Sequence, residues 1–447
     1  MTELDHTHDG SARSWVRSAG PTSEFPLQNL PLSVFRPAGA QGAFRGGIAI
    51  GDRILDLAAL SAGSLLEGLA AEAARAASRP SLNALLEMGR PAWRALRHGV
   101  FALLRDDAPA SARLACDACL VPLAEAQYAL PVDIGDYTDF YTSVDHALNI
   151  GRLYRPDDPL SANFRWMPIA YHGRVSSIGL SGERIRRPSG QWLAPGATTP
   201  VYGPSQRLDY ELELGIYIGT GNTLGEPIGV AKADDHAFGL CLLNDWSARD
   251  IQRWESTPLG PFQAKNFATT LSPWIVTMEA LAPYRLPWCR AGDEPQPLAH
   301  LDAGAVRQRG AFDVQLEVLL ETAADRARGG APQRLSATSF RHQYWSIAQM
   351  IAHHTAGGCN LRAGDLLGSG TISGPGAAEA GALIELARGG LAPLALDNGE
   401  RRSFLADGDA VILKGWCEKP GYARIGFGEC RGEILASDAP ARSSPAP

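Results

Sequence analysis

Residues 209–215 read D-Y-E-L-E-L-G, a run in which acidic and apolar side chains alternate. In a β-strand this alternation sends successive side chains to opposite faces of the sheet. Glu211 and Glu213 would therefore project from one face, while the apolar residues beside them would face the other way. The run predicts a strand with one acidic face and one apolar face.

Two further polar stretches follow this strand. Residues 244–255 read N-D-W-S-A-R-D-I-Q-R-W-E and include Asp245 and Arg249. Residues 258–270 read P-L-G-P-F-Q-A-K-N-F-A-T-T and hold Lys265, one of only four lysines in the chain. Together with the acidic strand, these stretches are where the chain concentrates its chemically active side chains.

The composition predicts a globular protein. The chain has 447 residues, of which 45% are apolar and 20% charged, enough for one large domain and a smaller one. A net charge of -7 argues against nucleic acid as a partner, because phosphate binding requires a basic surface. A small-molecule substrate fits this balance better.

The cysteines and the N-terminus indicate the compartment. Seven cysteines at scattered positions do not form the disulfide framework of a small secreted domain, so a reducing cytoplasm is expected. Cys116 and Cys119 form a C-x-x-C without a second ligand pair, so two buried thiols are favoured over a metal or redox site. The chain has no apolar run of 18 residues and an acidic start, so neither a membrane span nor a signal peptide is expected.

The N-terminal part of the chain is expected to combine strands and helices over residues 25–127. Gly51-Asp52, between two apolar runs, predicts a hairpin turn. Residues 57–77 and 82–105 have helical spacing, with Pro91 expected to interrupt the second.

The larger part of the chain, residues 128–437, reads as a mostly β domain with some α. A helix is expected after Ser339, which could cap it, and a surface excursion is expected over residues 286–311. The polar termini, residues 1–24 and 438–447, are expected to be disordered.

Four acids are embedded in apolar, aromatic-rich strands, where unpaired charge would be costly: Asp139, Glu211, Glu213 and Asp245. Carboxylate oxygens without a nearby cysteine suit a hard divalent cation, Ca²⁺ or Mg²⁺, rather than zinc. For the E-x-E pair alone, a solvated strand face paired to arginines is the alternative.

Several motifs resemble those of the fumarylacetoacetase family. They are G-D-Y-T-D-F-Y-T-S-x-x-H-A, Y-H-G-R-V-S-S-I, R-R-P-S-G-Q, D-Y-E-L-E-L-G, L-N-D-W-S-A-R-D-I-Q-R-W-E, P-L-G-P-F-Q-A-K-N-F-A-T and G-S-G-T-I-S-G-P, in this order over residues 135–375. F-P-L-Q-N-L-P near the start resembles the N-terminal domain of the family. The resemblance implies a small SH3-like β-barrel domain, a large β-rich catalytic domain and a homodimer.

The resemblance also implies hydrolysis of a carbon–carbon bond in 4-fumarylacetoacetate to fumarate and acetoacetate, the last step of tyrosine and phenylalanine breakdown. In this family pattern His146 matches the general base and Glu385 the carboxylate that orients it. Lys265, Arg249 and Gln252 match the donors that polarise the attacked carbonyl and stabilise the oxyanion.

The cation and the substrate have their own matches in the family pattern. The four acids would bind Ca²⁺ or Mg²⁺, Lys265 would offset their charge, and Thr269 would add an oxygen to a second cation site. The residues matched to substrate contacts are Tyr141, Arg155, Tyr171, Gln252 and Thr371. The chain departs from the family at Ser256, where a tyrosine that touches substrate is typical.

Two rival hypotheses remain. One is another reaction of the wider superfamily on a 2,4-dioxo acid, such as acylpyruvate hydrolysis or oxaloacetate decarboxylation. The other is a non-enzymatic cation-binding or scaffold protein. The intact set of acids, histidine and lysine favours an enzyme.

Overall fold

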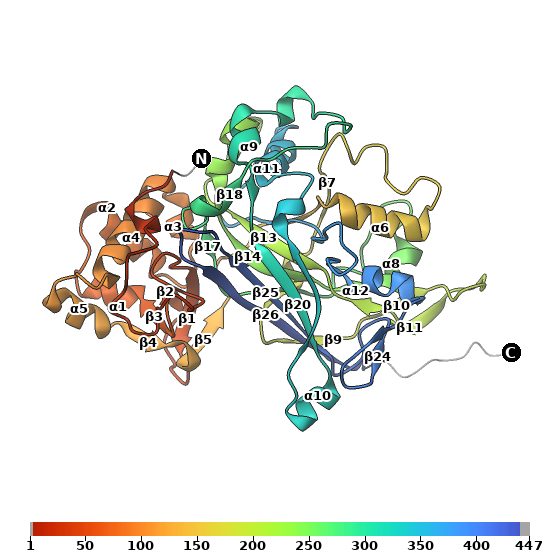
Figure 1. Cartoon of the computed structure of the whole chain (residues 1–447), viewed down its shortest axis with the longest axis horizontal. Coiled ribbons are helices and arrows are strands. Elements are labelled where there is room, and N and C mark those ends of the chain that lie inside the picture. Colours follow the sequence, from red (N-terminus) through yellow and green to blue (C-terminus); the bar gives the residue numbers. More distant parts are fainter. Residues whose placement is uncertain (1–2, 439–447) are drawn as a thin grey trace.

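The structure is a computed structural model that describes residues 3–438. Figure 1 shows a smaller N-terminal domain, in red and orange, beside a larger strand-rich domain. The smaller domain contains a five-stranded antiparallel sheet. In pairing order its strands are β4 (Leu120–Pro122), β3 (Arg53–Asp56), β2 (Arg45–Ile50), β1 (Leu32–Pro37) and β5 (Ala126–Ala129). No pairing joins β4 to β5 among the described residues, so the predicted SH3-like barrel is not confirmed.

The predicted hairpin and helices of this domain are confirmed in outline. β2 and β3 pair through Ile50 and Arg53 around the turn at Gly51-Asp52, where Gly51 has φ of +60°. Pro91 does not interrupt a helix but lies in the first turn of one. The backbone N–H groups of a first turn have no partner inside the helix, so a proline, which lacks this group, is tolerated there. The helices are α1 (Leu57–Ala62), α2 (Gly68–Ala77), α3 (Asn83–Glu87), α4 (Arg90–Leu104) and α5 (Ala110–Asp117).

The N-terminal segment is ordered from residue 3, so the prediction of disorder over residues 1–24 is wrong for the described part. His8 is buried, and its Nε2–H donates to the carbonyl of Glu279 at 2.7 Å. Val16 and Ala19 are also buried. The polar composition suggested a free tail. Instead, residues far along the chain, such as Glu279, bind and bury this segment, and no local sequence pattern reveals such contacts. Residues 1–2 and 439–447 lie outside the described residues.

The two thiols of the C-x-x-C are buried, as predicted. Burial raises the pKa of the Cys116 thiol to about 12. A protonated, buried thiol is neither a good nucleophile nor a metal ligand, which supports a packing role.

Two large sheets dominate the larger domain, and smaller two-stranded sheets flank them. The first has eight strands, of which seven run in the order β7, β6, β22, β13, β14, β16, β8, while β17 pairs with β14. Their bounds are β7 (Ile169–His172), β6 (Tyr137–Tyr141), β22 (Leu366–Gly368), β13 (Leu212–Ile218), β14 (Ala237–Asp245), β16 (Thr269–Leu271), β8 (Ile178–Leu180) and β17 (Val276–Thr277). The second sheet contains β21 (Gln333–Ser339), β20 (Gln315–Glu321), β25 (Ala410–Cys417), β26 (Ile425–Leu435) and β9 (Arg184–Arg186).

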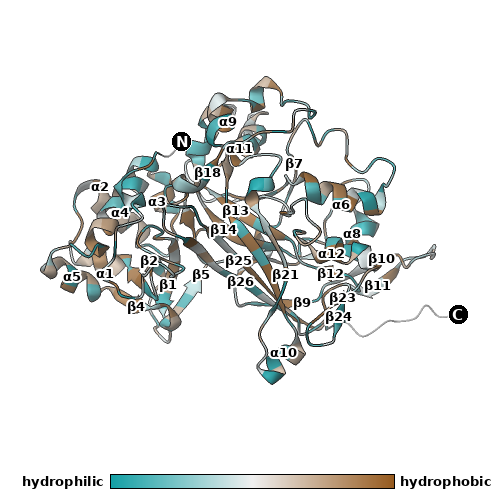
Figure 2. Ribbon diagram, viewed as in Figure 1, coloured by the Kyte–Doolittle hydropathy of each residue, from teal (hydrophilic) through white to brown (hydrophobic). Residues whose placement is uncertain are grey.

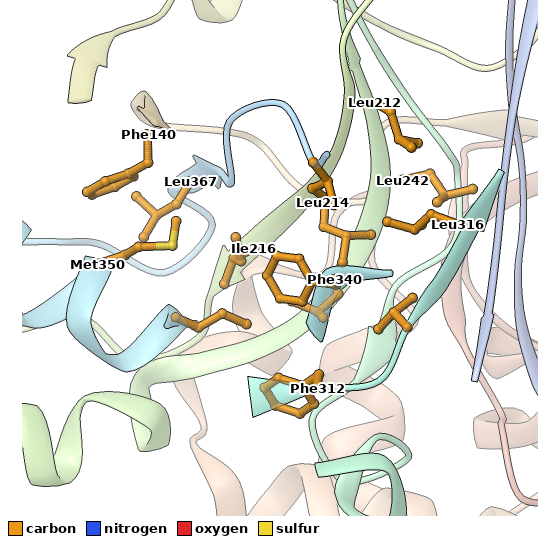
Figure 3. Close-up of a cluster of buried hydrophobic side chains, with 14 of the residues drawn as sticks. Phe140, Leu212, Leu214, Ile216, Leu242, Phe312, Leu316, Phe340, Met350 and Leu367 are labelled. Atoms are coloured by element: carbon orange, nitrogen blue, oxygen red, sulfur yellow. The ribbon is translucent and has the colours of Figure 1, made fainter. Parts of the chain in front are cut away.

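The core lies between these two sheets. Figure 3 shows Leu212 and Leu214 of β13 near Leu316 of β20 and Ile216 beside Phe340, and Leu212, Leu214, Ile216 and Leu316 are fully buried. Figure 2 shows the same division by hydropathy, with largely apolar central strands and a polar α10 (Ala323–Arg328) at the periphery. The apolar face predicted for the acidic strand is therefore confirmed, and the opposite face remains for the acids.

Some predicted boundaries of the larger domain move. Ser339 caps only a short 3₁₀ turn, and the helix α11 (Ile347–Thr355) begins after Ser346, which forms a capping box with Gln349. The predicted excursion over residues 286–311 contains buried residues of its own, such as Leu301. The predicted domain boundary at residue 128 falls inside β5, so we propose the boundary between β5 and β6. Within residues 3–438 no helix is both long and apolar enough to cross a bilayer.

Candidate active site

The four predicted acids meet on one face of the first sheet, over its central strands. Asp139 lies on β6, Glu213 on β13 and Asp245 at the end of β14, while Glu211 immediately precedes β13. Each offers a carboxylate oxygen, and these oxygens lie within 4.8 Å of one another. All four side chains are buried, so a solvated strand face is excluded.

A glycine makes room for this cluster. β22 separates β6 from β13, and its Gly368 pairs with Asp139 on one side and with Gly215 on the other. A Cβ at Gly368 would lie 2.7 Å from Asp139 Oδ1 and 3.0 Å from Glu213 Oε2. A side chain there would displace these carboxylates, so the glycine lets them converge above the backbone of β22.

Two basic side chains, Lys265 and Arg249, contact only part of the cluster. Lys265 Nζ donates to Glu211 Oε2 at 2.6 Å and also to Asp245. Arg249 Nη1 donates to Glu211 Oε1 at 2.7 Å. Burial opposes ionisation of Glu211, but Lys265 and Arg249 outweigh it and hold the pKa of its carboxyl well below its usual range. The structure thus places Lys265 beside the acids, as predicted from the sequence.

Among the described residues, no basic side chain forms an ion pair with the other two acids, Asp139 and Glu213. Burial, together with neighbouring carboxylates, raises the pKa of Asp139 and Glu213 well above the usual value. Asp139 Oδ1 and Glu213 Oε1 are buried and have no hydrogen-bond partner. Orphaned hard oxygens beside two charge-paired carboxylates are the donor set that Ca²⁺ and Mg²⁺ prefer. The residues therefore fit a divalent metal ion.

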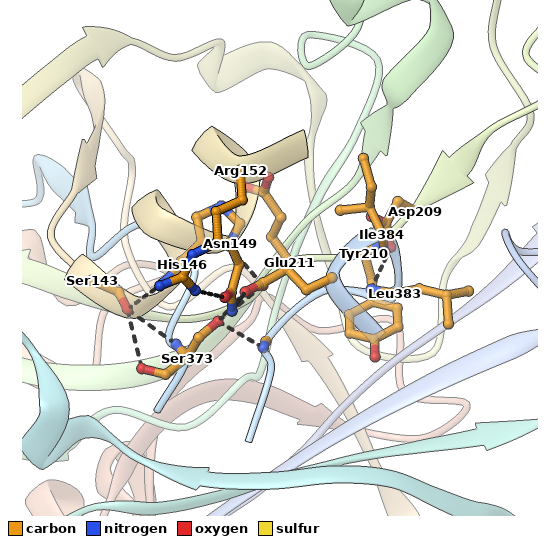
Figure 4. Close-up of polar contacts among 12 residues, drawn as sticks. Ser143, His146, Asn149, Arg152, Asp209, Tyr210, Glu211, Ser373, Leu383 and Ile384 are labelled. Atoms are coloured by element: carbon orange, nitrogen blue, oxygen red, sulfur yellow. Dashed lines mark hydrogen bonds and ion pairs between the residues drawn. The ribbon is translucent and has the colours of Figure 1, made fainter. Parts of the chain in front are cut away.

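A buried histidine–carboxylate pair lies near the acidic cluster, and Figure 4 shows the polar contacts around its histidine, His146, together with Glu211 of the cluster. His146 lies in the first turn of α6 (Val144–Tyr154), and its Nδ1–H donates to Glu385 Oε1 at 2.7 Å. Asn149 and Ser373 also donate to the Glu385 carboxylate, at 2.8 and 2.9 Å. Burial opposes ionisation, but the His146 charge and these three hydrogen bonds lower the pKa of Glu385. The carboxylate is held ionised and fixed in place.

A cavity of about 670 Å³ joins these groups. It exposes the imidazole of His146, the cluster through Asp139 and Glu211, and Lys265. The other predicted residues that line it are Tyr141, Arg155, Tyr171, Arg249, Gln252, Ser256 and Thr371. Thr269 does not line it and lies behind the cluster, paired with Asp245 in the ladder of β14 and β16.

The donors on α8 (Arg249–Glu255) are arranged toward the cavity. Arg249 Nη1 donates to Gln252 Oε1 at 3.1 Å, and its Nη2 is buried without a partner, although the residue lines the cavity. Ser256 turns back, and its hydroxyl donates to the backbone carbonyl of Gln252 at 2.5 Å. The hydroxyl proton of this small cavity-wall residue is therefore already used within α8.

Sequence reasoning missed three residues that hold the site together. Asn149 lies three positions after His146, on the same face of α6. Ser373 belongs to G-S-G-T-I-S-G-P, and Asp209 opens D-Y-E-L-E-L-G. Each stands inside a quoted motif or one helical turn from a predicted residue, and that proximity was the available signal.

A buried, hydrogen-bonded histidine–glutamate pair and a four-carboxylate cluster beside one cavity define an enzyme combining acid–base catalysis with a metal ion. Comparison with known proteins gives the family. The model described as "Fumarylacetoacetate (FAA) hydrolase C-terminal" matches residues 137–435, and "Fumarylacetoacetase N-terminal" matches residues 28–131. The chain belongs to the fumarylacetoacetase family and is a hydrolase.

Similarity to relatives extends over nearly the whole chain. The chain is 44% identical over 429 residues to fumarylacetoacetase of Oryza sativa subsp. japonica, covering 95% of this chain and 97% of the relative. It is 45% identical over 422 residues to that of Arabidopsis thaliana, covering 94% and 97%. It is 43% identical over 424 residues to that of Homo sapiens, covering 92% and 96%.

Proposed function

We propose that this chain hydrolyses the carbon–carbon bond of 4-fumarylacetoacetate to give fumarate and acetoacetate, the last step of tyrosine degradation. The observation that carries the proposal is the buried pair of His146 and Glu385, which faces the same cavity as the four-carboxylate cluster. Relatives named fumarylacetoacetase that match both domains support the choice of substrate.

His146 acts as the general base. Because its Nδ1–H donates to Glu385, Nε2 is the nitrogen that takes a proton from water. The resulting hydroxide attacks the ketone carbon of the fumaryl group, which becomes the second carboxyl carbon of fumarate, and the C=O electron pair moves to oxygen. Glu385 stabilises the imidazolium that forms, and it stays ionised because its pKa is low.

Lys265, Arg249 and Gln252 stabilise the negative charge that develops on the oxygen of the attacked carbonyl. Lys265 and Arg249 both line the cavity and are the charged donors for an oxyanion there. When the oxyanion collapses, the carbon–carbon bond breaks, and its electron pair passes to the acetoacetate fragment as an enolate. That carbon then takes the proton from His146, which restores the base.

The bound cation is Ca²⁺ or Mg²⁺, held by Asp139, Glu211, Glu213 and Asp245. When bound, it supplies positive charge for the oxygens of the diketone and its enolate. Thr269, behind Asp245 in the ladder, contributes to a second cation site.

Recognition of the acid groups falls to the cavity wall. Arg155 is exposed at the mouth and carries only a long contact to the Pro159 carbonyl, so its guanidinium is available to clamp a carboxylate. Tyr141, Tyr171 and Thr371 line the rest of the wall. We also propose a cytoplasmic homodimer, which light scattering coupled to size exclusion would test.

A substrate panel tests the proposal. With Mg²⁺ or Ca²⁺, the purified protein is expected to remove the ultraviolet absorbance of fumarylacetoacetate and to release fumarate. Turnover of acylpyruvates or oxaloacetate without turnover of fumarylacetoacetate would favour another reaction of the superfamily. Cation binding without turnover of any of these substrates would favour the non-enzymatic hypothesis.

A further inference from the structure

Asp209 lies between Arg249 and the short helix that carries Glu385. It belongs to β12 (Leu208–Asp209), which pairs with β15 (Ser247–Ala248), and its side chain is fully buried. Its Oδ2 accepts from Arg249 Nε at 2.9 Å, and the same carboxylate accepts backbone N–H groups at the start of α12. One side chain therefore contacts the oxyanion donor and the element that carries Glu385.

The contacts to α12 (Leu383–Leu386) replace a missing cap. The first N–H groups of a helix have no partner inside the helix, and a side chain at the N-cap position usually accepts from them. The N-cap residue here is Ala382, which offers no such acceptor. Asp209 supplies it, accepting from Leu383 N at 2.9 Å and from Ile384 N at 3.1 Å. Glu385 is the next residue along.

The contact to Arg249 fixes the orientation of the guanidinium. Asp209 binds Nε, and Glu211 binds Nη1 at 2.7 Å. Because the guanidinium is planar, fixing two nitrogens fixes the third. That third nitrogen, Nη2, is the buried donor without a partner in the cavity-lining Arg249.

We propose that Asp209 is a positioning residue that holds the oxyanion donor Arg249 and the base-supporting Glu385 in one fixed geometry. Asp209 does not line the cavity, so it acts through these two residues rather than on the substrate. The inference rests on the proposed function, because that function gives Arg249 and Glu385 their roles.

Asp209→Asn tests the proposal, with Asp409→Asn as a matched control. Asp409 is also fully buried and accepts from Arg402 Nε and from the backbone N–H of Ala406, both at 2.8 Å, but it lies outside the site. Asp209→Asn is expected to lower kcat about 100-fold, the size of a misplaced catalytic group. KM should change less than about threefold, because the lost interaction serves the transition state. Asp409→Asn should keep the kcat of the wild type.

A double-mutant cycle with Glu385→Gln separates positioning from general stability. If Asp209 acts partly through Glu385, Asp209→Asn costs clearly less than 100-fold once Glu385 is already replaced. Costs that multiply in full, or a kcat loss no larger than that of Asp409→Asn, would overturn the proposal.

Folding and the proposed function are checked separately. Circular dichroism establishes that each variant folds, and Asp209→Ser, whose hydroxyl retains one acceptor, stands in if Asp209→Asn does not. Failure of both to fold where Asp409→Asn folds would assign Asp209 to stability and overturn the proposal. If the wild type does not turn over fumarylacetoacetate, the proposed function fails. Normal wild-type turnover with unimpaired Asp209→Asn contradicts the positioning role alone.

Discussion

Replacing Glu385 by glutamine removes one charge from the buried pair while keeping the shape of the side chain. In the wild type, His146 Nδ1 and Glu385 Oε1 are 2.7 Å apart, and both side chains are almost fully buried. Two unit charges with centres about 4 Å apart interact by about 4 kcal/mol at an effective dielectric constant of about 20. If the imidazolium forms in the transition state, this loss corresponds to a fall in kcat of about 1,000-fold.

The assay is the initial rate of loss of fumarylacetoacetate absorbance at saturating substrate and cation. Glu379→Gln is the control, because Glu379 accepts from the backbone N–H of Gly376 in the same loop but does not line the cavity. It should retain the wild-type rate. If the folded Glu385→Gln variant loses less than about tenfold in kcat, well below the effect expected from one charge pair, Glu385 does not stabilise an imidazolium at His146 in the transition state.

The same substitution predicts a pH dependence of stability. The folded-state pKa of Glu385 is below its usual value, so the unfolded chain binds the proton more readily. Its contribution is therefore complete above the unfolded pKa of about 4.3 and is lost as the pH falls through the lower folded pKa. The difference in unfolding free energy between wild type and Glu385→Gln should shrink in acid, as urea titrations at several pH values would show.

Four further results are expected. His146→Ala should lower kcat by about 10²- to 10⁴-fold while calorimetry shows unchanged cation binding; an unchanged rate would remove it as the base. Cation at 100 times its Kd should stabilise the fold by about 2.7 kcal/mol, seen as a rise in Tm that chelation reverses. Arg97→Met should destabilise the protein by about 2–4 kcal/mol in urea, because this buried guanidinium donates to four acceptors of the N-terminal region. Of the seven cysteines, only Cys289 and Cys359 are exposed, so a thiol reagent should titrate two rapidly in the native protein.

Local patterns predicted the parts of the fold that local physics determines. The alternation at 209–215 predicted both faces of β13, and Gly51-Asp52 predicted the hairpin, since each depends on neighbouring residues alone. The order of residues 3–24 was missed because partners far along the chain satisfy it, as with His8 and Glu279. Ser339 was predicted as the cap, but Ser346 caps the helix. Both are serines before apolar runs, and only the structure distinguishes them.

The site shows the same limit. Motifs supplied its chemical groups, and the structure brings His146 together with Glu385, 239 positions along the chain. What motifs could not supply was which neighbours hold them. Asp209 acts through hydrogen bonds to a remote segment and Ser373 through one to Glu385, twelve positions along, so neither has a local signature of its function. Thr269 shows the converse: it stands in a motif but does not line the cavity.

The glycine at position 368 offers a way to separate the fold from its ion. A methyl group there would enter the space between Asp139 and Glu213, and the backbone of β22, paired on both sides, has no freedom to withdraw. An alanine at this one position would act as a permanent steric plug in an otherwise intact sheet. Such a variant would be a reference protein for attributing calorimetric and spectroscopic signals to the ion rather than to the surrounding carboxylates.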